Sequence, residues 1–215
     1  LINDEEVRFR GPEDAFKAGL GMVHQQYMLV QNMTVTENIA LGYKNAWKPY
    51  RLDIDTVRKH VGEISEKYSL LVNPDAYIWQ LSVGEQQRVE LVKTLCLGAK
   101  FLILDEPTSA LTPQETDELI ALLLKMTDEL SIIFISHKLN EVKALSSKVT
   151  ILRHGKVVFS GNTDEHSSED IAAKMTGHSI ILPKNTGTAE SNKGKTALSI
   201  NGITVMSDRK TVALD

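Results

Sequence analysis

The sequence predicts an α/β protein built on a parallel sheet, and three observations lead to this fold class. Two short apolar runs, Phe101–Leu104 and Ile132–Ile135, have the length and composition of strands buried on both faces of such a sheet. A helix-length segment whose leucines recur on one face lies between them, and another helical pattern precedes the first run. The order helix, strand, helix, strand favours parallel strands joined by right-handed crossovers.

The elements at the start of the chain follow from proline, glycine and apolar patterning. A short strand is expected near Val7–Phe9 and another at Leu20–Val23. The segment Pro12–Ala18 between them is expected to be helical. Gly19 can end this helix because glycine adopts positive φ without steric cost.

Three helices are expected between residue 30 and the first apolar run, each after a residue that can cap a helix. Serine, threonine or aspartate at the cap accepts a hydrogen bond from a backbone N–H of the first turn, and a glutamate three residues later can return the bond. The expected helices are Val35–Leu41 after the cap Thr34, a segment from Asp53 toward Tyr68, and Glu85–Leu97 after the cap Ser82.

The second half of the chain continues the alternation. Thr112 as cap and Pro113 at the first helical position start a helix whose apolar face includes Leu119 and Leu130. The remaining expected elements are a short helix at Leu139–Leu145, a hairpin at Val149–Phe159 that turns at His154-Gly155, and a helix from about Ser168 that Gly177 can end.

Composition limits the classes of function. The 215 residues include 24 Lys+Arg and 28 Asp+Glu, a formal net charge of −4, and no cluster of basic residues. Binding to nucleic-acid phosphates depends on such clusters, so no nucleic-acid partner is expected. The longest apolar runs fall far short of the roughly 20 residues that cross a bilayer. The single cysteine, Cys96, lies in an apolar helical pattern and is expected to be a buried structural thiol.

Patterning also divides the chain. Residues 1–182 are expected to form one domain, with a helical subdomain at about residues 30–97. Residues 183–196 lack periodicity and are rich in Asn, Thr, Gly, Ser and Lys, as a linker is. Residues 197–215 are expected to begin a second domain, with a strand at Ala197–Val205. The chain opens on Leu1 in what reads as a strand already under way, so the domain is expected to lack its beginning.

Two adjacent carboxylates follow the first apolar run, where the edge of an α/β sheet binds ligands. Asp105 suits a Mg²⁺ ion, and Glu106 suits the orientation or deprotonation of a water molecule that attacks a phosphate. A buried strand can also simply end in an acidic turn. The segment Ser82-Val83-Gly84-Glu85 also has two interpretations, which do not exclude each other. A helix N-terminus can bind an anion, or it can merely carry a capping box.

Two further polar residues follow expected strands. His137 comes directly after the second apolar run and can donate to a phosphate, although a histidine in this position is often only a surface residue. Gln25 follows the strand at Leu20–Val23, and its amide can hold a metal-bound water and a phosphate oxygen. By itself, Gln25 carries little information.

Together and in this order, these segments resemble the ATP-binding cassette (ABC) family of transport ATPases over almost the whole chain. Met22-Val23-His24-Gln25 and Leu81-Ser82-Val83-Gly84 are most similar to the tandem ATP-binding subunits of simple-sugar and nucleoside importers. The matching motifs are the glutamine loop at Gln25, the signature helix at Leu81–Gln87, Walker B at Phe101–Glu106, the D-loop at Ser109–Thr112 and the switch histidine His137.

The resemblance implies a P-loop NTPase-like (RecA-like) parallel sheet core with an inserted α-helical subdomain, and ATP and Mg²⁺ as cofactors. It implies an ATPase in which Glu106 acts as general base and His137 contacts the γ-phosphate. Asp105 and Gln25 would hold Mg²⁺, and Gln25 would also face the γ-phosphate. Ser82, Gly84 and Glu85 would reach ATP held by a facing cassette.

The resemblance also implies partners and a location. The expected partners are a second cassette of the same parent chain, membrane permease subunits and, indirectly, an extracytoplasmic substrate-binding protein. The subunit would lie peripherally at the cytoplasmic face of the membrane. Two other classes stay open: a soluble ABC-type ATPase of repair or translation, and a non-catalytic regulatory cassette.

The sequence departs from the family pattern at three places, one of them Thr112 of the D-loop, where many cassettes have aspartate. In the signature, Val83 replaces a glycine and Glu85 a glutamine, and a carboxylate near phosphates is unfavourable unless it points back to cap the helix. The P-loop is absent from the 215 residues: Gly194-Lys195-Thr196 lacks the glycine that the motif needs at position 189, which is Ala189. We therefore expect an N-terminally truncated domain that does not hydrolyse ATP by itself.

Overall fold

The computed structural model describes residues 6–43, 47–48 and 51–177, together with Ile2, Gly202, 204–206 and 212–214. The chain divides into two compact units, Leu1–Ile180 and Ile181–Asp215. The predicted linker at 183–196 lies outside the described residues, as does most of the strand predicted at Ala197–Val205. The predicted domain boundaries therefore stay predictions. In the second unit, β8 (Val205–Met206) pairs antiparallel with β9 (Val212–Leu214).

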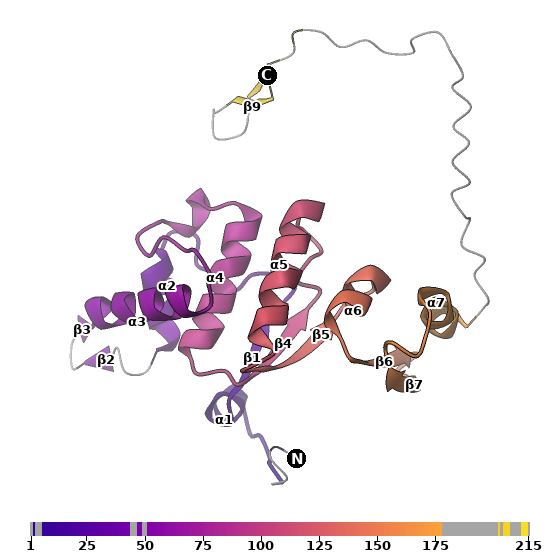
Figure 1. The fold of residues 1–215 in the computed structure, drawn as a ribbon. Coiled ribbons are helices and arrows are strands. Elements are labelled where there is room, and N and C mark those ends of the chain that lie inside the picture. The colour runs from indigo at the N-terminus through magenta and orange to yellow at the C-terminus, as the bar shows by residue number, and fades with distance from the viewer. Residues whose placement is uncertain are drawn as a thin grey trace. The chain divides into compact units, whose positions relative to one another are not determined.

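A three-stranded parallel sheet forms the centre of the first unit (Figure 1). The strand β4 (Phe101–Asp105) lies between β1 (Leu20–Val23) and β5 (Ser131–Ile135). Leu104 is paired with Val23 on one side and with Phe134 on the other, so the three strands run in register to a common carboxyl edge. The parallel α/β sheet predicted from the two apolar runs is confirmed.

Only one face of this sheet is covered among the described residues. Val23, Leu102 and Leu104 are buried in one core with side chains of α4 (Val83–Cys96) and α5 (Pro113–Met126). Side chains of the opposite face are more open, and the burial predicted on both faces of the two apolar runs is wrong. The exposed fractions there are 38% at Met22, 57% at Ile133 and 45% at Ile135.

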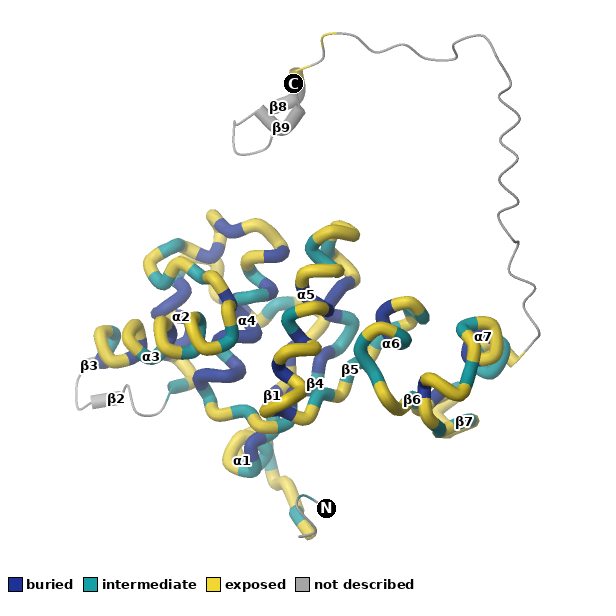
Figure 2. The backbone as a smooth tube through the Cα atoms, viewed as in Figure 1, coloured by how far each residue is buried: buried dark blue, intermediate teal, exposed yellow. Residues whose placement is uncertain are grey.

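The predicted helical region is formed by α2 (Val35–Gly42), α3 (Ile54–Lys67) and α4, which pack against one another. Their core includes Ile39, Val57 and Val61, and the buried stretches stand out in Figure 2. Two features within this region were not predicted. A short antiparallel pair, β2 (Trp47–Lys48) and β3 (Arg51–Leu52), precedes α3, and a 3₁₀ turn, η2 (Ile78–Gln80), precedes α4.

The predicted helix caps are confirmed. Thr34, Ser82 and Thr112 each accept from the backbone N–H three residues on, and the glutamate at that position returns a bond to the cap. The side chain of Asp53 caps α3 by accepting from the backbone N–H of Thr56. Helix α4 begins at Val83, two residues before the predicted start, because Ser82 itself is the cap.

The start of the described chain differs from the prediction in one element. Helix α1 (Pro12–Lys17) is present, and Gly19 follows it with φ of 80°. Residues 7–9, predicted as a strand, have no strand conformation. Strand β1 pairs only with β4 among the described residues, so this segment has no neighbouring strand in that part of the chain.

After β5 the described chain follows the predicted order. Helix α6 (Leu139–Leu145) leads to the hairpin β6 (Lys148–Arg153) and β7 (Lys156–Asn162), and α7 (Ser168–Thr176) ends at Gly177. The hairpin turns at His154 and Gly155, whose φ values of 50° and 73° are those of a tight turn with both central residues left-handed.

The cysteine prediction is also confirmed. Cys96 lies at the end of α4 inside the core, and burial raises the pKa of its thiol to about 12. A thiol with this pKa is protonated at neutral pH and is a poor nucleophile. No described helix is long and apolar enough to cross a membrane.

Replacing Gly21 with alanine is predicted to destabilise the protein. A Cβ at this position of β1 would lie 2.2 Å from Thr94 Cγ2 and 2.7 Å from Ala99 Cβ, so α4 has to move away from the sheet. The expected loss is roughly 1–3 kcal/mol in the free energy of unfolding, measured by urea denaturation. Gly62→Ala on α3 is the matched control, because nothing lies within 4 Å of its Cβ position. The control should gain about 0.5–1 kcal/mol, and equal losses in both variants would contradict the packing described here.

Candidate functional site

The loops that follow the three parallel strands meet at the carboxyl edge of the sheet. Gln25 follows β1, Glu106 follows β4 and His137 follows β5. The amide Nε2 of Gln25 donates to Glu106 Oε2 at 3.3 Å, and Nδ1 of His137 lies 3.0 Å from Glu106 Oε1. Three of the predicted site residues are therefore joined on one carboxylate.

The backbone of Glu106 is left-handed, with φ of 44°. Such a conformation costs roughly 1–2 kcal/mol for a residue with a side chain. It is held on both sides, because the Glu106 N–H donates to the carbonyl of Ile135 at 2.9 Å and the Glu106 carbonyl accepts from Ser109 N–H at 3.1 Å. This turn directs the carboxylate between Gln25 and His137.

The hydrogen bonds determine what each group can still do. A carboxylate has only acceptor atoms, so its hydrogen bond with His137 requires a proton on Nδ1 and leaves Nε2 for another partner. Gln25 uses its amide nitrogen on Glu106, which leaves its oxygen available as a ligand. The side chain of Glu106 is 29% exposed and that of His137 64% exposed, so the site is open to solvent.

The residues at this edge fit a magnesium ion held partly by water. Asp105 and Gln25 offer the oxygen ligands that Mg²⁺ prefers, and Asp105 is the residue before Glu106 at the end of β4. The described part of the chain contains no group of three or more His, Cys, Asp and Glu side chains that could hold a metal ion. Mg²⁺ commonly binds through one or two protein ligands, waters and substrate phosphates, and this donor set suits that arrangement.

The other three predicted site residues lie together at the start of α4. Glu85 points back along the helix: its Oε2 accepts from the Ser82 N–H at 2.7 Å, while Ser82 Oγ accepts from the Glu85 N–H at 3.3 Å. Gly84 is buried, and a Cβ there would lie 2.6 Å from Glu115 Oε1. The atom that this Cβ would meet is the far end of the Glu115 side chain, so the lack of a Cβ at position 84 gives the Glu115 carboxylate room beside α4.

Glu115 belongs to the capping box of α5 and remains charged. Thr112 donates to it from its backbone N–H at 2.9 Å and from its hydroxyl at 2.8 Å, and these bonds hold the pKa of Glu115 below its ordinary value. The start of α5 therefore places a carboxylate directly beside the start of α4.

A buried ion pair on α4, which the sequence did not predict, holds the chain after Gln25. Glu90 Oε1 accepts from the backbone N–H of Met28 at 2.7 Å, and Lys93 Nζ donates to the Met28 carbonyl at 3.0 Å. Glu90 is only 5% exposed and lies 3.4 Å from Lys93 Nζ. Beside it, burial and then the charges of Glu115 and Glu90 raise the pKa of Tyr27 to about 12.

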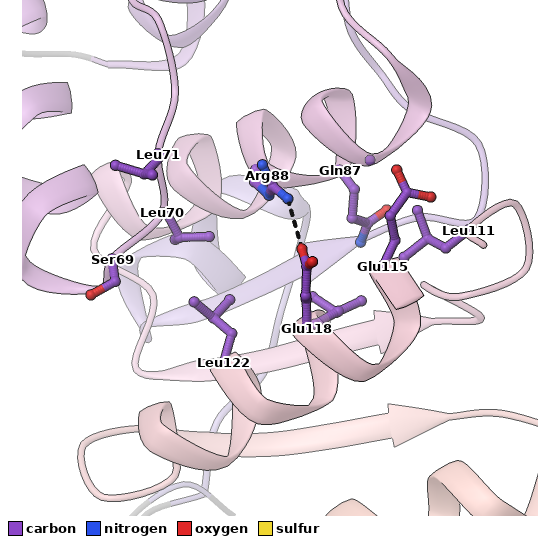
Figure 3. Close-up of a pocket in the computed structure, with 11 residues that line it drawn as sticks. Ser69, Leu70, Leu71, Gln87, Arg88, Leu111, Glu115, Glu118 and Leu122 are labelled. Atoms are coloured by element: carbon purple, nitrogen blue, oxygen red, sulfur yellow. Dashed lines mark hydrogen bonds and ion pairs between the residues drawn. The ribbon is translucent and has the colours of Figure 1, made fainter. Parts of the chain in front are cut away.

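A cavity of the described structure lies elsewhere, between α4, α5 and the loop at 69–71 (Figure 3). Its volume is about 230 Å³ and most of its lining is apolar. Arg88 and Glu118 are joined by a bond of 3.3 Å at its wall. Gln87 also lines it, but both polar atoms of this amide are buried and lack a hydrogen-bond partner. None of the residues at the carboxyl edge of the sheet contributes to this cavity.

A family model described as "ABC transporter" matches residues 1–109. The chain belongs to the ABC transporter family. The fold of its first unit matches solved ABC structures. One is cbiO1 from Clostridium perfringens, part of the ABC transporter complex cbiONQ, with a TM-score of 0.61 and 28% identity over 77% of this chain and 65% of that one. Another, a putative metal-chelate type ABC transporter, has a TM-score of 0.64 at 19% identity and covers 74% of this chain and 64% of that one, and it supports the fold alone.

Curated relatives of this ABC chain are import proteins. The nucleoside import ATP-binding protein NupA of Lactococcus lactis is 45% identical over 170 residues, which are 79% of this chain and 33% of the relative. The guanosine import ATP-binding protein NupO of Bacillus subtilis is 39% identical over 97% of this chain and 40% of its own length. The ribose import ATP-binding protein RbsA 1 of Streptomyces avermitilis is 34% identical over 95% of this chain and 38% of its own length. The chain thus spans between a third and two fifths of the length of these relatives.

Removing the Glu90 side chain is predicted to destabilise the ABC domain, because the Met28 N–H and Lys93 lose a charged partner in a buried place. Glu90→Ala should cost roughly 1.5–3 kcal/mol in the free energy of unfolding, measured by urea denaturation. Glu118→Ala is the matched control, since Glu118 is paired with Arg88 but its side chain is 54% exposed, and it should cost about 0–1 kcal/mol. Similar costs for the two variants would show that Glu90 does not hold the Met28 segment.

Proposed function

We propose that this chain is most of the first ATP-binding cassette of an importer's ATPase subunit, which serves nucleosides or simple sugars. The observation that carries the proposal is the Glu106 carboxylate, hydrogen-bonded by Gln25 and His137 at the edge of a parallel sheet. The import proteins among its relatives support the transport class, with a nucleoside importer at 45% identity. The reaction is hydrolysis of ATP coupled to import.

Each residue at the edge has a role that its contacts support. ATP supplies, when bound with Mg²⁺, a γ-phosphoryl group that water can attack. Glu106 would orient and deprotonate that water, and its bond to His137 Nδ1 leaves Nε2 for the phosphate region, where in the imidazolium form it donates to a phosphate oxygen. Asp105 and the amide oxygen of Gln25 would hold the metal and its waters.

The open face of the sheet supports a further part of the proposal. Met22, Ile133 and Ile135 form an apolar surface on strands whose ends carry the site. The strand and helix that bear the P-loop of an ABC cassette are expected to pack there and to complete the phosphate cradle. Residues 1–215 contain no such loop, so we expect this chain by itself to show no ATP hydrolysis.

The start of α4 is proposed to act on a second cassette of the parent protein. Ser82 retains its hydroxyl hydrogen as a donor, and the N-terminus of α4 attracts anions, so Ser82, Gly84 and Glu85 would meet ATP held across the interface. Glu85 is the feature that favoured a non-catalytic regulatory cassette. Its carboxylate caps the helix, which answers the electrostatic objection that Glu85 itself raises. No contact in the described chain favours an ATPase of repair or translation.

A surface for the membrane permease is proposed where two segments of the helical region run side by side. The N–H groups of Ile78 and Trp79 donate to the carbonyls of Met33 and Gln31. Large apolar side chains are exposed along both segments and at Met28, which Glu90 and Lys93 hold beside α4. We call this the Trp79 patch; its members are Met28, Val30, Tyr77 and Trp79. Apolar patches of this kind mark protein interfaces, and this one would hold the protein peripherally at the cytoplasmic face of the membrane.

Substitution of the proposed base should separate hydrolysis from binding. In the full-length protein, Glu106→Gln is predicted to slow ATP hydrolysis by about 100-fold or more while the Kd for ATP stays within about twofold. The amide is nearly isosteric with the carboxylate but cannot accept a proton. Phosphate release and equilibrium nucleotide binding measure the two effects, with the second composite site disabled in every sample.

Glu129→Gln is the matched control for this experiment, because Glu129 is exposed and its contacts are with Lys67 and Tyr68. It should leave hydrolysis unchanged. Full turnover in Glu106→Gln with the second site disabled would refute the assignment of Glu106 as base.

Shortening the exposed indole should weaken docking. Trp79→Ala is predicted to lower the affinity of the ATPase subunit for its permease in membranes by roughly tenfold or more, because Trp79 is a large aromatic side chain, 53% exposed on the proposed surface. Co-sedimentation with permease-containing vesicles measures the affinity. Leu124→Ala, an exposed leucine on α5, should bind as the unsubstituted protein does. If the two variants bind equally well, the Trp79 patch is not the permease contact.

A further inference from the structure

A buried carboxylate is bonded to residues close in sequence to Glu106 and His137. Glu141, on α6, is 6% exposed, and its Oε2 accepts from Thr108 Oγ1 at 2.8 Å and from Ser136 Oγ at 2.9 Å. Thr108 is the second residue after Glu106, and Ser136 directly precedes His137. One oxygen of Glu141 thus joins the loop after β4 to the loop after β5.

The second oxygen of Glu141 holds the residue on the other side of His137. Lys138 Nζ lies 3.1 Å from Glu141 Oε1 and also donates to the Thr108 carbonyl at 3.0 Å. The backbone N–H of Lys138 donates to Ser136 Oγ at 3.0 Å. Glu141, Ser136 and Lys138 are thus linked in a closed ring of hydrogen bonds. Both neighbours of His137 are therefore tied to a single carboxylate, while the imidazole itself stays exposed and bonds to Glu106.

The chemistry of this network favours a geometric role. Removing a carboxylate from water is costly, and well-packed apolar residues often give as much stability as a buried ion pair. Two hydroxyl donors and an ammonium group compensate the charge of Glu141. Their hydrogen bonds also fix the orientation of the backbone segments that carry them, which apolar packing would not do. The directions fixed here are those of the two loops that carry the proposed base and the histidine.

We propose that Glu141 is the positioning residue for His137, acting through Ser136, Lys138 and Thr108 to hold the imidazole against Glu106. The proposal rests on the function proposed above and deepens it. The hydrogen bonds and ion pair of Glu141 are with Thr108, Ser136 and Lys138, so its effect on hydrolysis passes through the position of the histidine. The same carboxylate keeps the loops after β4 and β5 at a constant separation.

The test is a double-mutant cycle in the full-length ATPase assembled with its permease. Glu141→Gln is expected to lower kcat for ATP by roughly 10- to 100-fold with little change in KM, since a small displacement of a reacting group has effects of this size. In the His137→Ala background the same substitution should change kcat by less than about twofold, because the group that Glu141 positions is gone. A loss of the same factor in both backgrounds overturns the proposal, as does an unchanged kcat in the single variant.

A second pair of variants keeps the proposal testable if Glu141→Gln folds poorly. Thr108→Ser retains the hydroxyl that donates to Glu141 and should retain kcat. Thr108→Val has nearly the same shape without the hydroxyl and should lower kcat as Glu141→Gln does. Equal rates for the serine and valine variants overturn the proposal, since the hydroxyl that donates to Glu141 would then have no effect on hydrolysis.

The position of His137 is also measured without nucleotide. In the full-length subunit with ¹⁵N-labelled histidine, the His137 ring is expected to show a protonated Nδ1, and Glu141→Gln and Thr108→Val should shift it toward the tautomer mixture of free imidazole. Unchanged ring signals in both variants overturn the proposal. If His137→Ala and Glu106→Gln leave hydrolysis unaffected, the proposed function fails, and the ring signals alone then decide whether Glu141 positions His137.

Discussion

The hydrogen-bond register of β1, β4 and β5 is the constraint on which the site depends. Parallel strands in register end at one edge, so the residues that follow them meet although they are far apart in sequence. A shift of one residue in β4 would turn Asp105 and Glu106 to the opposite faces of the sheet. The left-handed turn at Glu106 is compatible with this register because the Glu106 N–H continues the pairing of β4 with the Ile135 carbonyl.

Buried carboxylates on helices hold the loops that the register brings together. Glu90 on α4 accepts from the chain after β1, and Glu141 on α6 accepts from residues after β4 and β5. Each carboxylate is accompanied by a lysine that also donates to a backbone carbonyl of the loop it holds. The loops after all three strands are thus held by hydrogen bonds to charged side chains. Hydrogen bonds are directional, so Glu90 and Glu141 fix the orientation of these loops, which apolar packing alone would not do.

The sequence predicted what depends on neighbouring residues. Helix caps at Thr34, Ser82 and Thr112 and the turn at His154-Gly155 are local, and all four are present. Parallel pairing also followed, because fully apolar runs separated by a helix have few alternatives. Parallel pairing places His137 near the edge that carries Asp105 and Glu106, whereas Gln25 was assigned to the site only through the family resemblance.

Features that depend on distant partners were not predictable. Burial of Ile133 and Ile135 was expected from composition, yet burial is decided by what packs on the strand, and α4 and α5 cover only the opposite face in the described chain. Residues 7–9 have strand-like side chains but no neighbouring strand there. Glu90 and Glu141 bond to residues 62 and 33 positions away, and a glutamate in a helix has no local pattern that distinguishes such a role from exposure.

The central claim is that one sheet edge forms the hydrolytic centre of an import ATPase. A cryo-electron microscopy structure of the full-length protein with its permease, a non-hydrolysable ATP analogue and Mg²⁺ tests it most directly. The account predicts a terminal phosphate about 3–4 Å from the side chains of Gln25 and His137, with Glu106 facing the water that would attack it. A terminal phosphate bound at a place that none of these three residues lines would contradict it.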